Sequence, residues 1–112
     1  MNHLNYEFDA SPGDVAEVTL DRAANVLLMD PASYDDYTHG RTYRYEGGYA
    51  RKSPVRLTVP RAGHWHAVVD LGGGAGQVRA FVSLLTGHRH EGRIPAGRQT
   101  GPARGAESLR GF

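Results

Sequence analysis

The chain has 112 residues, a length that suits one domain with a single hydrophobic core and excludes a second core of similar size. Its 39% hydrophobic residues, 15 glycines and 6 prolines favour a turn-rich all-β domain over a helical bundle or a disordered chain. The formal net charge of +1 is too small to indicate nucleic-acid binding, and the absence of cysteine excludes disulfides and cysteine-ligated metal sites.

Three strands are predicted in the first 30 residues. Residues 4–10 alternate apolar and polar side chains, as a strand with one buried face does. The sequence SPGD, at residues 11–14, is typical of a turn, and further strands follow at 15–20 and 24–30. Because only the three residues DRA join these two strands, we expect them to form an antiparallel hairpin.

A short helix is predicted after the third strand. Asp30 can accept hydrogen bonds from the free N–H groups of a helix N-terminus, and Pro31 suits the first helical position. We therefore expect one or two helical turns within residues 31–40, ending at Gly40.

An aromatic hairpin is predicted beyond the helix. Tyr43 and Tyr45 have the two-residue spacing of side chains on one face of a strand. Gly47 and Gly48 are then expected to form the turn, and Tyr49 to begin the returning strand.

The last regular segments are predicted strands at 54–60, 64–71 and 77–85, which we expect to form a meander. Within residues 64–71, alternation places two sets of side chains on opposite faces. The face that contains the tryptophan is expected to be buried: Trp65, Ala67, Val69 and Leu71 lie on it, and His64, His66, Val68 and Asp70 lie on the other.

Together these elements predict an all-β fold, a single compact antiparallel β-sandwich of jelly-roll type with about seven or eight strands and one short helix. Residues 1–86 form this domain. Residues 87–112 carry five Lys and Arg against two Asp and Glu, with six glycines and only isolated apolar residues. We expect this segment to be a flexible, basic Gly/Arg-rich tail, because it buries too little apolar surface to offset its ordering entropy.

The N-terminal segment has no apolar run typical of a secretory signal, and no stretch approaches the ~20 apolar residues of a membrane span. We therefore expect a cytoplasmic protein with no membrane partner. The lack of cysteine is consistent with a reducing compartment.

Three sequence blocks carry a family resemblance: FDASPGDVAEVTLDRAANVLLMD, YDDYTHGRTYRYEGGYARKSPVRLTVP and AGHWHAVVDLGG, in this order. Residues 1 to about 86 resemble a family of small bacterial proteins, the domain of unknown function DUF1883. The resemblance implies a compact β-sandwich, found alone or joined to a TIR-type signalling domain, and it implies no activity or catalytic residue. No TIR domain follows here, so a signalling partner is expected on another chain.

A second, looser resemblance concerns the fold alone. VLLMDPASYDDYTHG, followed by LTVPRAGHWHAVVD, is similar to the pattern of Golgi-dynamics-type ligand-binding β-sandwiches. A Golgi-dynamics-like sandwich is therefore the alternative to the jelly-roll type.

Five of the six tyrosines lie between residues 34 and 49, and arginines interleave with them. Tyrosine covers a large area at low entropy cost and keeps a polar tip, which suits stacking on sugars and anchoring of protein partners. In the alternative interpretation, the tyrosines close one end of the sandwich and the arginines are solvated. The candidate binding residues are Tyr34, Tyr37, Arg41, Tyr43, Arg44, Tyr45 and Tyr49.

The histidines suggest a metal site as a second hypothesis. His64 and His66 lie on one face of a strand, and His88 and His90 follow the next strand, so the four imidazoles could meet on neighbouring strands. The H-x-H spacing is similar to the cupin pattern, but the glutamate expected a few residues later is absent. In the alternative, the histidines of 64–66 are half-exposed strand residues that hydrogen-bond across the sheet.

No set of nucleophile, base and acid emerges from the sequence, so we favour a protein that is not an enzyme. The first hypothesis is a binding or sensory module for a small ligand, glycan or protein, without a cofactor, in an accessory role to TIR-type signalling. The second is a metal-binding protein or metal-dependent enzyme that holds a divalent transition metal. Nucleic-acid binding by the basic tail is a third, weaker hypothesis, and exposed sheet edges make a homodimer reasonable.

Overall fold

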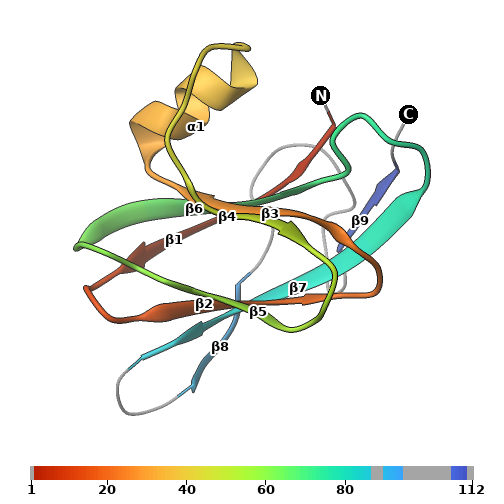
Figure 1. The fold of residues 1–112 in the computed structure, drawn as a ribbon. Helices are drawn as coiled ribbons and strands as arrows, with labels where there is room; N and C mark the ends of the chain where they lie inside the picture. The colour runs from red at the N-terminus through yellow and green to blue at the C-terminus, as the bar shows by residue number, and fades with distance from the viewer. Residues whose placement is uncertain (1, 87–89, 95–106, 111–112) are drawn as a thin grey trace.

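A computed structural model describes the backbone of residues 2–86, 90–94 and 107–110 and the side chains of residues 2–86. Two antiparallel sheets pack face to face, and one short helix lies on the outside of the first sheet (Figure 1). The first sheet has the order β1-β6-β3-β4, formed by β1 (Leu4–Ala10), β6 (Gly63–Asp70), β3 (Ala24–Met29) and β4 (Glu46–Ala50).

The second sheet has the order β5-β2-β7-β8, and a further strand, β9, also pairs with β7. Its strands are β5 (Val55–Thr58), β2 (Val15–Leu20), β7 (Gln77–Leu85), β8 (His90–Ile94) and β9 (Glu107–Arg110). The predicted antiparallel β-sandwich with one short helix is confirmed, with strands β1 to β7 inside the predicted domain.

The predicted hairpin of β2 and β3 is wrong, because β2 belongs to the second sheet and β3 to the first. Residues 21–23 join them. Three extended residues span about 10 Å, which is also the distance between two packed sheets, so this short link crosses the sandwich as easily as it would turn within one sheet.

The predicted meander of the last three strands is wrong for the same reason. Consecutive strands β5, β6 and β7 alternate between the sheets: β5 and β7 flank β2, whereas β6 lies between β1 and β3. Hydrophobic alternation shows which face of a strand is buried but carries no information about its neighbours.

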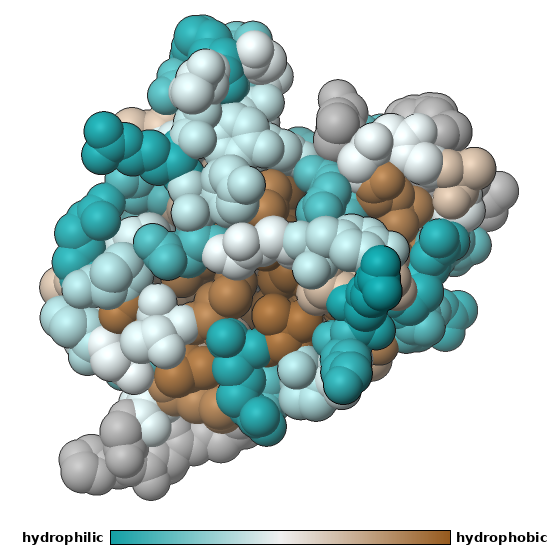
Figure 2. Space-filling view, viewed as in Figure 1, coloured by the Kyte–Doolittle hydropathy of each residue, from teal (hydrophilic) through white to brown (hydrophobic). Residues whose placement is uncertain are grey.

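The core between the sheets is formed by the inward faces of all the central strands. Tyr6, Val18, Leu28 and Trp65 are among its buried side chains, and the hydroxyl of Tyr6 donates to the carbonyl of Ala80 in the opposite sheet at 3.2 Å. Figure 2, seen from the same side as Figure 1, shows apolar residues in the middle of the molecule, where the two sheets meet, and mostly hydrophilic residues over the helix. The predicted burial of Trp65 is confirmed.

Helix α1 (Pro31–Thr38) forms where the Asp-Pro pair predicts it, and the chain leaves it through Gly40, which has a φ of 72°. The Oδ1 atom of Asp30 accepts a hydrogen bond from the N–H of Ser33 at 2.8 Å, as an N-cap does. Its Oδ2 atom lies 2.6 Å from Nη2 of Arg61. No helix in the described part of the chain is long and apolar enough to cross a membrane.

Replacing Asp30 with alanine is expected to lower the free energy of unfolding by about 1 kcal/mol, because the N–H of Ser33 loses its acceptor. The backbone N–H of Ser33 and the charge of Arg61 lower the pKa of Asp30, although burial opposes them. The stabilisation is therefore complete above the unfolded-state pKa and is lost as the pH falls through the lower folded-state pKa.

Urea unfolding at pH 7 and at acidic pH measures both effects on Asp30. The matched variant Asp30→Asn retains an acceptor for Ser33 but loses the charge, so its stability should lie between those of the parent and Asp30→Ala at pH 7. Equal urea midpoints for the parent and Asp30→Ala at pH 7 would contradict the cap.

The predicted aromatic hairpin is wrong. Residues 41–45 are irregular, and β4 runs through both glycines, with Gly47 opposite Leu27 and Gly48 opposite Val26. Gly47 has a φ of 107°, and a Cβ atom there would collide with the backbone oxygen of Val26. The glycine therefore permits a close approach between two strands, a use that its sequence alone does not distinguish from a turn.

The segment after residue 86 contains β8 and β9, which pair with β7 on the side away from β2. Its other residues all lie outside the described part of the chain, so the flexible tail stays a prediction. His88 is also outside the described residues, and His90 begins β8 in the second sheet.

Candidate functional site

The tyrosine segment divides into an inner and an outer group. Tyr34 and Tyr37 on α1, together with Tyr43, are partly buried and pack on the outer face of the first sheet. They cover a small second core of Leu27, Met29 and Val68. Three of the five predicted binding tyrosines therefore attach the helix and the following loop to the sheet.

Asp70 of β6 links α1 to the first sheet through a hydrogen bond. It is 3% exposed, and its Oδ2 atom accepts a hydrogen bond from the hydroxyl of Tyr37 at 2.6 Å. Its Oδ1 atom accepts from Nδ2 of Asn25 at 2.8 Å and from the N–H of Gly72 at 2.9 Å. Burial and the bond to Asp70 raise the pKa of Tyr37, so this tyrosine is a neutral donor.

Tyr45 and Tyr49 form the outer group, with exposed fractions of 48% and 65%. Both rings line an open hollow of about 310 Å³. Inner tyrosines and polar groups of the first sheet line it as well. We name it the tyrosine hollow; its lining is Asn25, Leu27, Tyr37, Tyr43, Tyr45, Gly48, Tyr49, Asp70 and Gly72.

Tyr37 and Tyr43 do not form an exposed pair, since both pack against the second core. The helical spacing of Tyr34 and Tyr37 turns these rings toward the sheet, whereas Tyr45 and Tyr49 come from the irregular loop and the edge strand. The centroid of Tyr43 lies 5.5 Å from that of Tyr45, so the inner group contacts the outer group through these two rings.

The predicted arginines do not converge on the tyrosine hollow. Arg41 is exposed and pairs with Asp36 at 2.9 Å and Asp35 at 2.8 Å. Arg44 lines a separate hollow of about 240 Å³ beside Arg61 and Trp65.

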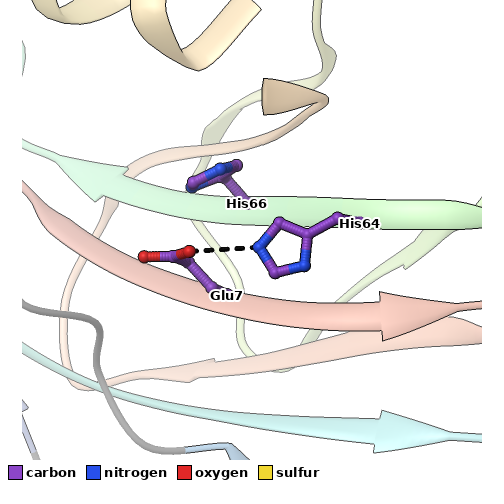
Figure 3. Close-up of side chains that lie close together, drawn as sticks. All are labelled: Glu7, His64 and His66. Atoms are coloured by element: carbon purple, nitrogen blue, oxygen red, sulfur yellow. Dashed lines mark hydrogen bonds and ion pairs between the residues drawn. The ribbon is translucent and has the colours of Figure 1, made fainter. Parts of the chain in front are cut away.

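Three side chains that could hold a metal ion meet on the outer face of β1 and β6. Glu7 of β1 lies directly opposite His66 of β6, and His64 lies on the same face of β6, two residues before His66. Figure 3 shows the carboxylate and both imidazoles gathered on this face. Their potential ligand atoms all lie within 4.8 Å of one another, and within the described residues this is the only such group of three.

His64 is held between two carboxylates. Its Nδ1 atom lies 2.8 Å from Oδ1 of Asp9, and its Nε2 atom lies 3.0 Å from Oε1 of Glu7. These hydrogen bonds, the one to Asp9 first, raise the pKa of His64 against the smaller opposing effect of burial.

His66 is buried, contrary to the half-exposed position considered from the sequence, because α1 covers this end of the face. Its ring stacks on Tyr34 with centroids 4.1 Å apart and an interplanar angle of 7°. Its Nδ1 atom donates to Oδ1 of Asn5 at 2.8 Å.

Sequence reasoning missed Glu7 because it searched for a carboxylate further along β6. The alternation of Asn5, Glu7 and Asp9 along β1 is a signal for one polar face, but only the pairing of β1 with β6 brings that face to the histidines. His90 begins β8 in the other sheet, so strand pairing does not bring it next to β6.

Comparison with known proteins identifies the family. A family model described as a domain of unknown function, DUF1883, matches residues 1–88, which include both the tyrosine hollow and the Glu7, His64 and His66 group. No curated protein and no solved structure matches the chain significantly. The chain therefore belongs to the DUF1883 family of domains of unknown function.

Proposed function

We propose that this protein is a non-catalytic binding module that takes up a small ligand, or one sugar unit of a glycan, in the tyrosine hollow. The observation that carries the proposal is the pair of exposed rings, Tyr45 and Tyr49, beside hydrogen-bonding groups of the partly buried Asn25 and the buried Asp70. Aromatic rings with a few convergent polar groups are the usual composition of a small-molecule site.

The size of the hollow supports a small ligand. Its volume of about 310 Å³ is at the lower end of the range of roughly 300–1,000 Å³ typical of ligand sites. Such a volume accommodates one ring-sized group, which favours a small ligand or sugar unit over the broad surface of a protein partner. The accessory role in TIR-type signalling, the cytoplasmic location and the homodimer stay predictions.

Rigid walls also support the proposal. Tyr37 is fixed by its hydrogen bond to Asp70, and Tyr43 packs edge-on against Tyr37 with centroids 5.2 Å apart. A site with preformed walls loses less conformational entropy when a ligand binds. The exposed Tyr45 and Tyr49 are then free to supply the contacts that recognise the ligand.

Replacing Tyr45 and Tyr49 together with alanine is expected to weaken binding at least tenfold, because a stacked aromatic anchor contributes about 1–2 kcal/mol or more. Stability should change by less than about 1 kcal/mol, since both rings are exposed. The probes are a set of monosaccharides and ring-sized fragments, titrated into ¹⁵N-labelled protein and followed by amide chemical shifts.

The matched control is the double variant Tyr45→Phe and Tyr49→Phe, which keeps both rings and should retain most of the affinity. Unchanged affinity in the double alanine variant would refute the proposal. So would a titration in which no probe perturbs the amides of Gly48, Tyr49 and Gly72.

A further inference from the structure

The group formed by Glu7, His64 and His66 has the composition of a metal site. Two imidazoles and one carboxylate are the ligand set of many three-ligand zinc and iron sites, in which the remaining positions are left for water or another ligand. The three side chains come from two adjacent strands in fixed register, with Glu7 directly opposite His66.

The histidines are oriented by partners on β1, as metal-binding histidines usually are. Nδ1 of His64 is held by Asp9 at 2.8 Å, and Nδ1 of His66 is held by Asn5 at 2.8 Å. With Nδ1 engaged in both rings, Nε2 is the ligand atom that each ring can offer. In His64 this atom already faces Oε1 of Glu7, at 3.0 Å (Figure 3).

From this geometry we propose that Glu7, His64 and His66 bind a divalent first-row transition metal ion, with Zn²⁺ as the best-suited ion. The site lies on β1 and β6 and shares no residue with the tyrosine hollow, so the inference is independent of the proposed binding function.

The distances require only a small rearrangement. Ligand atoms bound at about 2.0–2.1 Å to a tetrahedral ion lie roughly 3.3 Å apart, whereas the three atoms here lie within 4.8 Å. His66 is immobilised by its stack on Tyr34, but His64 has 40% of its side chain exposed and can turn toward an ion. Binding replaces the proton shared between His64 and Glu7 with the metal.

The ligand chemistry selects the class of ion. Mg²⁺ and Ca²⁺ prefer sets of oxygen ligands, whereas imidazole suits zinc and its neighbours. The exposed side of His64 gives the ion a path from solvent, and a water molecule would complete its coordination on that side.

The test is calorimetric titration of ZnSO₄ into untagged, chelator-treated protein, with Co²⁺ absorption spectra as a report on coordination. We expect about one Zn²⁺ per chain and visible Co²⁺ bands typical of a four- or five-coordinate site. Glu7→Gln and His64→Ala should each weaken Zn²⁺ binding more than tenfold, and Asp9→Asn about tenfold through the orientation of His64.

His39→Ala is the matched control, because His39 is an exposed histidine that also faces a carboxylate, Asp35, at 3.4 Å. It should bind Zn²⁺ like the parent. Thermal melts in EDTA verify that each variant is folded. Because the side chain of His64 is exposed, His64→Ala is the variant expected to disturb the core least.

Three results would overturn the site. The first is the absence of stoichiometric Zn²⁺ binding by the parent, and the second is parent-like affinity in folded Glu7→Gln and His64→Ala. The third is a loss of affinity in the double variant His88→Ala and His90→Ala without any loss in His64→Ala, which would place the metal on the C-terminal segment.

Discussion

Replacing Trp65 with alanine is expected to lower the free energy of unfolding by about 3–5 kcal/mol, the range found for large aromatic side chains removed from a core. Trp65 is 4% exposed between the two sheets. Its Nε1 atom donates to the carbonyl of Arg61 at 3.0 Å, and the guanidinium of Arg61 lies 4.9 Å from the ring centroid. The substitution therefore removes apolar contacts, a hydrogen bond and a cation–π contact together.

Urea unfolding followed by far-UV circular dichroism measures this loss, since the variant has no tryptophan fluorescence. Trp65→Phe is the control: it keeps an aromatic ring in the core and loses the Nε1 donor, so it should cost less than Trp65→Ala. Coinciding urea midpoints for the parent and Trp65→Ala would show that the ring does not belong to the core.

Asp70→Ala is expected to have the second-largest effect, a loss of about 3 kcal/mol. The buried carboxylate accepts hydrogen bonds from Tyr37, Asn25 and the backbone of Gly72. Removing the acceptor leaves the partly buried donors of Tyr37 and Asn25 without this partner, and a fully buried donor left without a partner costs roughly 1–3 kcal/mol. The substitution also removes one link between α1 and the sheet, because the bond from Tyr37 crosses between them.

Tyr37→Phe separates the two parts of this effect. It removes only the hydroxyl and should cost about 1–2 kcal/mol, while the other two donors keep their acceptor. In a double-mutant cycle, Tyr37→Phe and Asp70→Ala should therefore be strongly non-additive. Additive losses, measured by urea unfolding of all four proteins, would show that the two groups do not interact.

Local signals were sufficient for most of the secondary structure. The alternation in residues 64–71 predicted that Trp65 faces the core, and Asp30 followed by Pro31 predicted the start of the helix, because both depend on contacts within a few residues. The same local information failed at Gly47. There, a strand that needs close approach and a hairpin turn both favour glycine, and only the neighbouring strand distinguishes them.

The candidate sites depended more on tertiary structure. The sequence placed five tyrosines in one short segment, but whether each ring is packed or exposed depended on α1 lying on the first sheet. The sequence likewise placed His64 and His66 on one face, whereas their carboxylate partner came from a strand more than fifty residues earlier in the chain.

The sequence by itself therefore determined a single β-sandwich domain, the inward face of its central strands and the start of its helix, because hydrophobic periodicity and capping act over a few residues. Only the tertiary structure decided which strands are neighbours, and with them the pairing of Glu7 with His66 and the position of Tyr45 and Tyr49 around one hollow. Strand pairing joins segments far apart in the chain, and short links such as residues 21–23 are compatible with either sheet.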